Sequence, residues 1–286
     1  MEDNPLSLIK KDFIRSLIKD GRREDGRGFD DHRPLDIQVN YVSKAQGSAR
    51  VRLGNTQVVA GVKVQLEKPY PDTPNRGNFM TSAELNPMAS PNFEPGPPRI
   101  EAIELARVTD RSLRESGVID FEALAWKPGE NVWAVFVDLE ILDYDGNLFD
   151  ACSIAGLAAV LSAKLPATDP KSKEVVFADG KDRPLPVRVD NATFSVTSVK
   201  IGNSILVDPH LHEELICDTR LTIGLDPKGN MRAMQKGGYG SWTLDEVKET
   251  RRKSQALGLK VFEKIQKAVK TGHYKEEAPV ATIRQK

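Results

Sequence analysis

Proline is concentrated in one stretch of the chain, and this concentration limits the possible folds more than any other feature of the sequence. Residues 69–98 contain eight of the eighteen prolines, three of them in the sequence EPGPP. A proline ring fixes φ and removes the backbone N–H, so this density excludes a regular helix and a central strand. The stretch also carries apolar side chains that a free linker would lack, namely Phe79, Met80, Leu85, Met88 and Phe93. We therefore expect a long packed loop over 69–98 that encloses a short strand at 79–85.

The segments around this loop show clear periodicities. Residues 48–66 predict a hairpin that turns at Gly54-Asn55, and residues 131–143 predict a strand. Residues 151–164 are apolar almost all round, which predicts a buried helix. Residues 99–117 predict an amphipathic helix whose apolar side is formed by Ala102, Ile103, Leu105, Ala106, Val108 and Leu113.

The second half of the chain continues with predicted strands at 193–201, 204–209, 221–225 and 231–235. A last helix begins at Thr243, which forms a capping box with Glu246. Consecutive hairpins favour an α+β fold over a doubly wound sheet, and the pattern suggests two units of similar build. We predict a helical arm at 1–32 with Leu8, Ile9, Phe13, Leu17 and Ile18 as its apolar side, a first unit at 33–166, a second at 167–270 and a flexible tail at 271–286.

Charge and composition exclude several functional classes. Forty-one basic residues balance forty-one acidic ones, so a polyanion site must be a local patch, although residues 245–286 carry a surplus of five positive charges. No apolar stretch approaches the ~20 residues that would span a membrane. We therefore expect no association with a membrane. The two cysteines are too few and too isolated for a disulfide framework or a zinc cluster, which indicates a reducing cytoplasm.

Three arginines in the helix predicted at 99–117 form one stripe. Arg107, Arg111 and Arg114 follow the spacing i, i+4, i+7 and therefore lie opposite the apolar side. On spacing alone, the favoured interpretation is a solvated face partly neutralised by Glu104 and Glu115. The alternative is a clamp for phosphate groups, because guanidinium forks suit that chemistry.

Other candidate motifs give weaker signals. His210 and His212 would share one face of an extended segment and so qualify as metal ligands, but the sequence DPHLHEE is more typical of an exposed turn. Residues 237–240, GGYG, lack the rest of a phosphate loop. No nucleophile motif is present, so the residues alone give no support for nucleophilic catalysis. We also predict no bound metal and no cofactor, and the family resemblance described below implies that there are no catalytic residues.

A set of motifs follows a fixed order along most of the chain. The order is GRREDGRGFDDHRPL, AQGSARVRLGNTQVVAGVKV, DTPNRGNFMTSAELNPMASPNFEPGPP, IELARVTDRSLRES, VDPHLHEE and MQKGGYG. It resembles the RNase PH family of phosphate-dependent exoribonucleases, and within that family the non-catalytic ring subunits of archaeal exosomes. The resemblance spans residues 6–270 and implies an RNase PH-like fold of two βαβα-type units with helices packed on mixed sheets.

The resemblance also implies a set of partners. The chain would form a heterodimer with a catalytic RNase PH-type subunit, and three copies of this pair would make a hexameric ring around an RNA channel. Trimeric RNA-binding cap subunits and single-stranded RNA would bind that ring during phosphate-dependent 3'-to-5' degradation. The resemblance also changes the favoured interpretation of the arginine stripe from a solvated face to an RNA contact. Arg107 and Arg111 match the RNA-contacting pair of the family, and Arg114 is a third candidate.

Departures from the family pattern imply that this chain performs no chemistry. Catalytic members hold phosphate with an arginine after an Asp-Gly turn, whereas here Asp145-Gly146 is followed by Asn147, Leu148 and Phe149. An ungapped placement puts Glu214 and Arg220 where catalytic members have two aspartates. The competing hypotheses are an autonomous phosphorolytic 3'-to-5' exoribonuclease and a metal-dependent hydrolase using His210 and His212.

Overall fold

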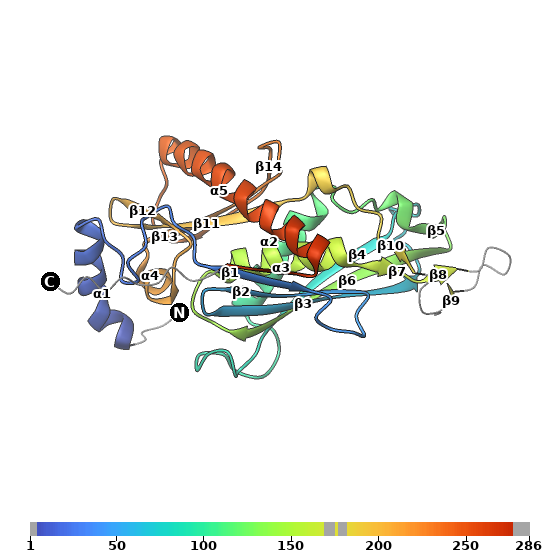
Figure 1. Cartoon of the computed structure of the whole chain (residues 1–286), viewed down its shortest axis with the longest axis horizontal. Coiled ribbons are helices and arrows are strands. Elements are labelled where there is room, and N and C mark those ends of the chain that lie inside the picture. The colour runs from blue at the N-terminus through green and yellow to red at the C-terminus, as the bar shows by residue number, and fades with distance from the viewer. Residues whose placement is uncertain (1–4, 169–174, 177–181, 277–286) are drawn as a thin grey trace.

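A seven-stranded mixed sheet forms the larger half of the molecule (Figure 1). The computed structural model describes residues 5–168, 175–176 and 182–276. The strand order is β15-β1-β2-β3-β6-β4, and β5 also pairs with β6. Only β4 runs parallel to its neighbour. The strands are β1 (Leu35–Val39), β2 (Gly47–Leu53), β3 (Thr56–Glu67), β4 (Asn78–Leu85), β5 (Ala125–Lys127), β6 (Asn131–Asp143) and β15 (His273–Lys275).

The predicted hairpin and the predicted short strand are both present in this sheet. β2 and β3 pair antiparallel around Gly54, whose φ of 60° is readily adopted by glycine. β4 lies at the edge of the sheet, where the prolines on either side of it interrupt no ladder. The predicted strand within the Pro-rich stretch is confirmed, but the predicted packing is confirmed only in part: Phe79 is buried and Phe93 packs on the core, whereas Met88 is 79% exposed.

A smaller, four-stranded antiparallel sheet forms the second half, in the order β12-β11-β13-β14. It consists of β11 (Phe194–Ile201), β12 (Ser204–Val207), β13 (Thr219–Leu225) and β14 (Met231–Gly238). Two short ladders lie outside the main sheets: β7 (Lys164–Leu165) pairs with β10 (Arg183–Pro184), and β8 (Ala167–Thr168) pairs with β9 (Val175–Val176). Two single 3-10 turns are η1 (Glu122–Leu124) and η2 (Val189–Asn191). The expected α+β class is confirmed, although the two sheets differ in size.

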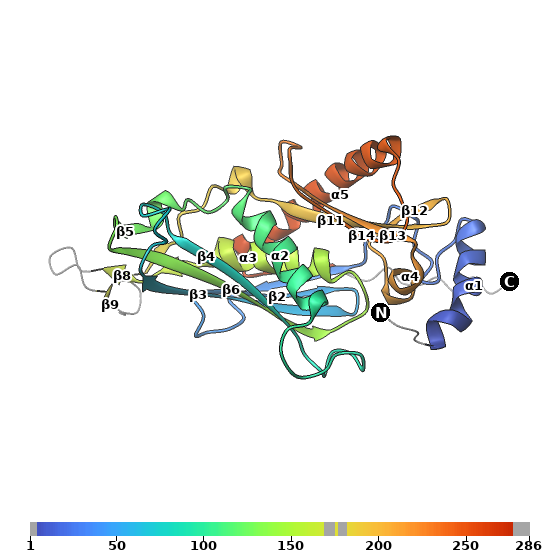
Figure 2. The ribbon, with the colours of Figure 1, turned by 180° about the vertical axis from the view of Figure 1, so that it is seen from behind.

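Helices α2 (Ile100–Arg114) and α3 (Leu148–Ser162) lie between the two sheets (Figure 2). α3 contacts β2 and β3 of the larger sheet and β11 of the smaller one. This placement explains why α3 is apolar all round: residues 148–160 are all buried. The helix α5 (Leu244–Thr271) crosses from the smaller sheet to β1 and β15 and begins with the predicted capping box of Thr243 and Glu246.

The two ends of the chain pack on different halves. α1 (Pro5–Lys19) docks through Ile14 and Ile18 on a cluster with Val199, Leu206 and Ile216, while Phe13, expected on the apolar side, is 56% exposed. The predicted tail does not begin at residue 271, because β15 pairs with β1 and completes the larger sheet. The later tail residues lie outside the described ranges.

The boundary between the two units, expected at residue 166, stays a prediction. Within the described ranges, every helix is too short or too polar to cross a bilayer.

Candidate functional site

The arginine stripe lies on the exposed side of α2. The helix buries Ala102, Leu105, Val108, Thr109, Ser112 and Leu113 against α3 and the two sheets. The expected apolar side is corrected at one position: Ile103 is 48% exposed, because it lies one turn before Arg107 and shares its face. Ile100 is 81% exposed on the same stripe. The outer side of α2 therefore combines two isoleucines with arginines.

The three arginines of this stripe differ in their contacts. Arg114 donates from Nε and Nη2 to the carboxylate of Asp110, each at 2.9 Å, and from Nη2 to the backbone oxygen of Phe79 at 2.7 Å. The hydrogen bond with Asp110 raises the pKa of Arg114. Arg107 is exposed and Arg111 is half-buried, and neither forms an ion pair within the described part of the chain. Arg107 and Arg111 thus carry the uncompensated charge.

The turn between β6 and α3 is held rigidly by Asn147. Its backbone is left-handed with a φ of 54°, and its side chain accepts the N–H of Asp150 as the N-cap of α3. The Asn147 Nδ2 atom donates to Asp150 at 2.8 Å and to Asp208 at 2.6 Å. Its backbone N–H donates to Glu214 at 2.7 Å. The side-chain amide and the backbone N–H of Asn147 are therefore already paired within the protein.

Arg220 covers the aromatic residue that follows this turn. Its guanidinium carbon lies 3.9 Å from the centre of the Phe149 ring, and its Nη2 donates to Glu104 of α2 at 2.6 Å. Gly237 lies opposite Arg220 in the sheet, and a Cβ there would come within 2.8 Å of Nη2. The structure thus brings Phe149, Glu214 and Arg220 together, as the family resemblance implies, but as a closed cluster.

Two buried carboxylates behind the turn have pKa values that are shifted in opposite directions. Burial raises the pKa of Asp150 to about 6, against the opposing effects of His32 and of the hydrogen bond from Asn147. Burial acts in the same direction on Asp208, but the Arg33 guanidinium holds the pKa of Asp208 well below its usual range. Asp208 is therefore a fixed anion, and its charge is used to bind arginines rather than a ligand.

Arginines of the motif GRREDGRGFDDHRP hold this region together, a role that the sequence did not reveal. Arg23 and Glu213 are fully buried and form a two-pronged pair with distances of 2.8 and 2.6 Å. Arg33 donates to Asp208 at 2.8 Å and to the backbone oxygen of Asp145 at 2.7 Å. The available signal was the density of arginine in a segment that nevertheless lacks helical or strand periodicity.

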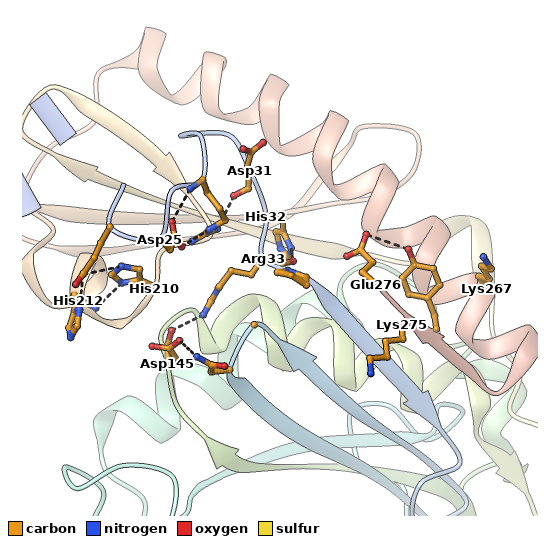
Figure 3. A pocket seen from close by; sticks show the side chains of 16 residues that line it. Asp25, Asp31, His32, Arg33, Asp145, His210, His212, Lys267, Lys275 and Glu276 are labelled. Carbon is orange, nitrogen blue, oxygen red and sulfur yellow. Dashed lines mark hydrogen bonds and ion pairs between the residues drawn. The ribbon is translucent and has the colours of Figure 1, made fainter. Parts of the chain in front are cut away.

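Arg33 and Asp145 border a pocket of about 930 Å³ (Figure 3). Its walls come from the segment 24–34, the turns at 54–55 and 145, the start of α4 (Leu211–Ile216) and the end of α5 with β15. Charges of both signs alternate around it: Arg27, Lys267 and Lys275 stand beside Asp31, Asp145 and Glu276. Such a lining offers no net field for a polyanion.

The prediction of an exposed turn at DPHLHEE is wrong. Asp208 and Glu213 are fully buried, and His210 is the N-cap of α4, where its Nδ1 atom accepts backbone N–H groups of His212 and Glu213. His210 and His212 do approach Glu24, at 3.5 and 2.9 Å. Because Nδ1 of His210 accepts, the neutral ring carries its proton on Nε2, the atom that a metal would need. Lys10 also lies 3.6 Å from Glu24, so this cluster does not favour a cation.

Comparisons with known proteins agree with the geometry. The family models for the 3' exoribonuclease family match residues 31–166 as domain 1 and residues 191–253 as domain 2. The exosome complex component Rrp42 of Pyrococcus horikoshii is 49% identical over 86% of this chain and 90% of that protein.

Solved structures show the same similarity. A chain of the Archaeoglobus fulgidus exosome, solved with RNA bound to the active site, superposes with a TM-score of 0.84 at 47% identity over 91% of this chain and 99% of that one. An archaeal exosome core gives a TM-score of 0.81 at 44% identity over 93% of this chain and all of the other. The resemblance seen in the motifs is confirmed, and the chain belongs to the RNase PH family of 3' exoribonucleases.

Proposed function

We propose that this chain is a non-catalytic exosome subunit that contributes RNA contacts to the active site of a catalytic RNase PH-type partner. The two subunits form a heterodimer, three heterodimers form a hexameric ring, and trimeric cap subunits bind that ring. The observation that carries the proposal is the combination of a blocked phosphate turn with an uncompensated arginine stripe on α2, the helix that Arg220 joins to this turn.

The absence of chemistry follows from the turn at 145–149. Phosphorolysis needs a phosphate nucleophile and donors that stabilise the charge developing on the attacked phosphodiester. Here Phe149 stands where catalytic members have the phosphate-holding arginine, and Arg220 is already paired with Glu104. The backbone N–H of Asn147 is bonded to Glu214, so this donor is not left for an anion. This arrangement disfavours the rival hypothesis of an autonomous exoribonuclease.

RNA contact is assigned to Arg107 and Arg111. Side chains at i and i+4 lie on one face about 6 Å apart along the helix, close to the spacing of successive phosphates in an extended strand. The relative from Archaeoglobus fulgidus belongs to an exosome solved with RNA in its active site, which supports the same role for this chain. Contacts of this kind give affinity without reading the base sequence. Arg114 contributes less, because Asp110 neutralises it.

Activity assays test the catalytic part of the proposal. The purified chain, its catalytic paralogue and the assembled complex are each incubated with single-stranded RNA and inorganic phosphate, and the release of nucleoside diphosphates is measured. We expect no release by this chain alone and robust release by the complex. Phosphate-dependent release by the isolated chain would overturn the assignment.

Binding assays test the RNA contacts. Arg107→Ala together with Arg111→Ala should weaken the binding of a single-stranded oligonucleotide by the complex and lower the slope of log affinity against log salt by about 0.7 per lost contact. The Arg188→Gln variant is the control, because Arg188 is also exposed but lies outside α2 and is paired with Asp120. An unchanged affinity and slope in the double variant would return the stripe to a solvated face.

A further inference from the structure

The two acidic residues nearest to Arg107 are both occupied by other arginines. Glu104 precedes Arg107 by three residues and Asp110 follows it by three, so each is a natural partner for Arg107 on one helix face. Neither pairs with it. Arg220 of β13 binds Glu104 at 2.6 Å, and Arg114 binds Asp110 at 2.9 Å.

The groups that bind Glu104 lie outside α2, on the strands of the smaller sheet. Besides Arg220, the Nε2 atom of Gln235 on β14 donates to the same carboxylate oxygen at 3.0 Å. Arg220 is itself fixed from two sides, since its guanidinium lies over the Phe149 ring and against Gly237, where any Cβ would collide with it. Its side chain is only 10% exposed, against 30% for Glu104. The pair is therefore more shielded from water than ordinary surface ion pairs, and it draws the carboxylate toward the smaller sheet.

We infer that Arg220 is a positioning residue for RNA binding: it removes Glu104 from competition for Arg107 and so keeps the outer side of α2 positively charged. This inference rests on the proposed function. Arg114 acts in the same way on Asp110. Without Arg220, Glu104 would be an anion within reach of Arg107, and an incoming phosphate would have to displace it.

The inference makes a prediction that a purely structural role would not share. Arg220→Gln should weaken the binding of a single-stranded oligonucleotide by the assembled complex about fivefold at 0.1 M salt, the effect of one lost single-strand phosphate contact. Removing the freed carboxylate as well, in Arg220→Gln with Glu104→Gln, should restore the affinity. If Arg220 touched RNA directly, or if the variant merely loosened α2, the second substitution would restore nothing.

A further variant separates the possible outcomes. Arg220→Lys keeps the ion pair and should bind RNA like the wild type. Thermal unfolding and complex assembly are recorded for each variant, so that a folding defect is seen independently. If Arg107→Ala weakens binding but Glu104→Gln fails to rescue Arg220→Gln, this inference is wrong and the proposed function stands. If Arg107→Ala and Arg111→Ala have no effect, the proposed RNA contact fails first.

Discussion

Asp150 shows how much of the region around the β6–α3 turn depends on single buried side chains. It is fully buried, accepts hydrogen bonds from Asn147 and from both the N–H and the hydroxyl of Thr197, and lies near the permanent charge of Asp208. In the sequence Asp150 is simply an acidic residue in the first turn of a helix. Its titration depends on His32 and Asp208, which are so distant along the chain that no local pattern contains them.

The pH dependence of stability should report this buried carboxyl. Because the pKa of Asp150 is raised to about 6 from 3.8, the folded state binds more protons than the unfolded state between these values, and this residue lowers the free energy of unfolding as the pH rises through that window. Asp150→Asn keeps the shape and can donate to the Thr197 hydroxyl, but it does not titrate. Relative to wild type, the variant should therefore gain about 2 kcal/mol between pH 4 and pH 7.

Urea unfolding at the two pH values measures this difference. Asp245→Asn is the control, because Asp245 has a side chain that is 95% exposed, and it should follow the wild type. Parallel pH profiles for Asp150→Asn and wild type would show that Asp150 does not titrate as proposed.

The arginine stripe and the buried ion pairs differ in how far sequence could reveal them. Arg107 and Arg111 were found because helical periodicity projects them onto one face, and the structure keeps them there. The role of His210 as a helix cap was not found, because a six-residue helix has too few residues to show periodicity. The pairing of Arg23 with Glu213 joins residues 190 positions apart, a contact that only the folded chain defines.

At the scale of elements, most long helices and strands could be predicted and their close contacts could not. The apolar pattern of 151–164 predicts a buried helix, and α3 is indeed enclosed by both sheets. In contrast, nothing in the sequence of α5 shows that Gly258 is the point where this helix meets the smaller sheet. A Cβ at Gly258 would lie 2.0 Å from the ring of Phe194, which is itself buried beside Phe262.

Gly258→Ala should therefore destabilise the protein although alanine favours helices. The gain in helix propensity is at most about 1 kcal/mol, whereas overpacking a rigid aromatic core typically costs about 1–3 kcal/mol. We expect a net loss of up to about 2–3 kcal/mol in the free energy of unfolding, measured by urea denaturation. Gly61→Ala on β3 is the matched control, since a Cβ at this position would meet no atom within 4 Å, and it should not be destabilised. Equal stabilities of the two variants would contradict this view of the contact.

At the scale of the whole molecule, the halves are joined by contacts that cross the chain order. Arg33, just before β1, binds Asp208 of the second half and the backbone of the turn at Asp145 and Gly146. At the other end, β15 returns to pair with β1, so residues 273–275 of the predicted tail belong to the larger sheet. A three-residue strand has no periodic signal, so its position is set by tertiary pairing alone.

One part of the molecular surface has the features of a protein-binding face, and it suggests where the proposed partner would bind. Ile100 and Ile103 are exposed on α2, and β14 is an edge strand that pairs only with β13 among the described strands. Large apolar side chains and free strand edges favour association with another chain. Because this stripe continues into Arg107 and Arg111, the proposed catalytic neighbour would cover the isoleucines and leave the arginines at the shared cleft.

Substitution of both isoleucines by aspartate tests this arrangement. Ile100 and Ile103 lie in the first turn of α2, where negative charge is favourable to the helix, so Ile100→Asp with Ile103→Asp should leave the fold intact. Burying a fully exposed isoleucine contributes about 1.5–3 kcal/mol, so we expect about tenfold in affinity from Ile100 and less from Ile103, which is already half-buried. We expect light scattering of the variant mixed with the catalytic paralogue to detect free subunits at concentrations where the wild-type pair is fully assembled.

Val189→Asp is the control, because the Val189 side chain in η2 is also partly exposed, at 37%, but lies outside α2; this variant should assemble normally. Normal assembly of the double variant would mean that the partner binds elsewhere on the molecule, and the arginines of α2 would then lie outside the shared cleft.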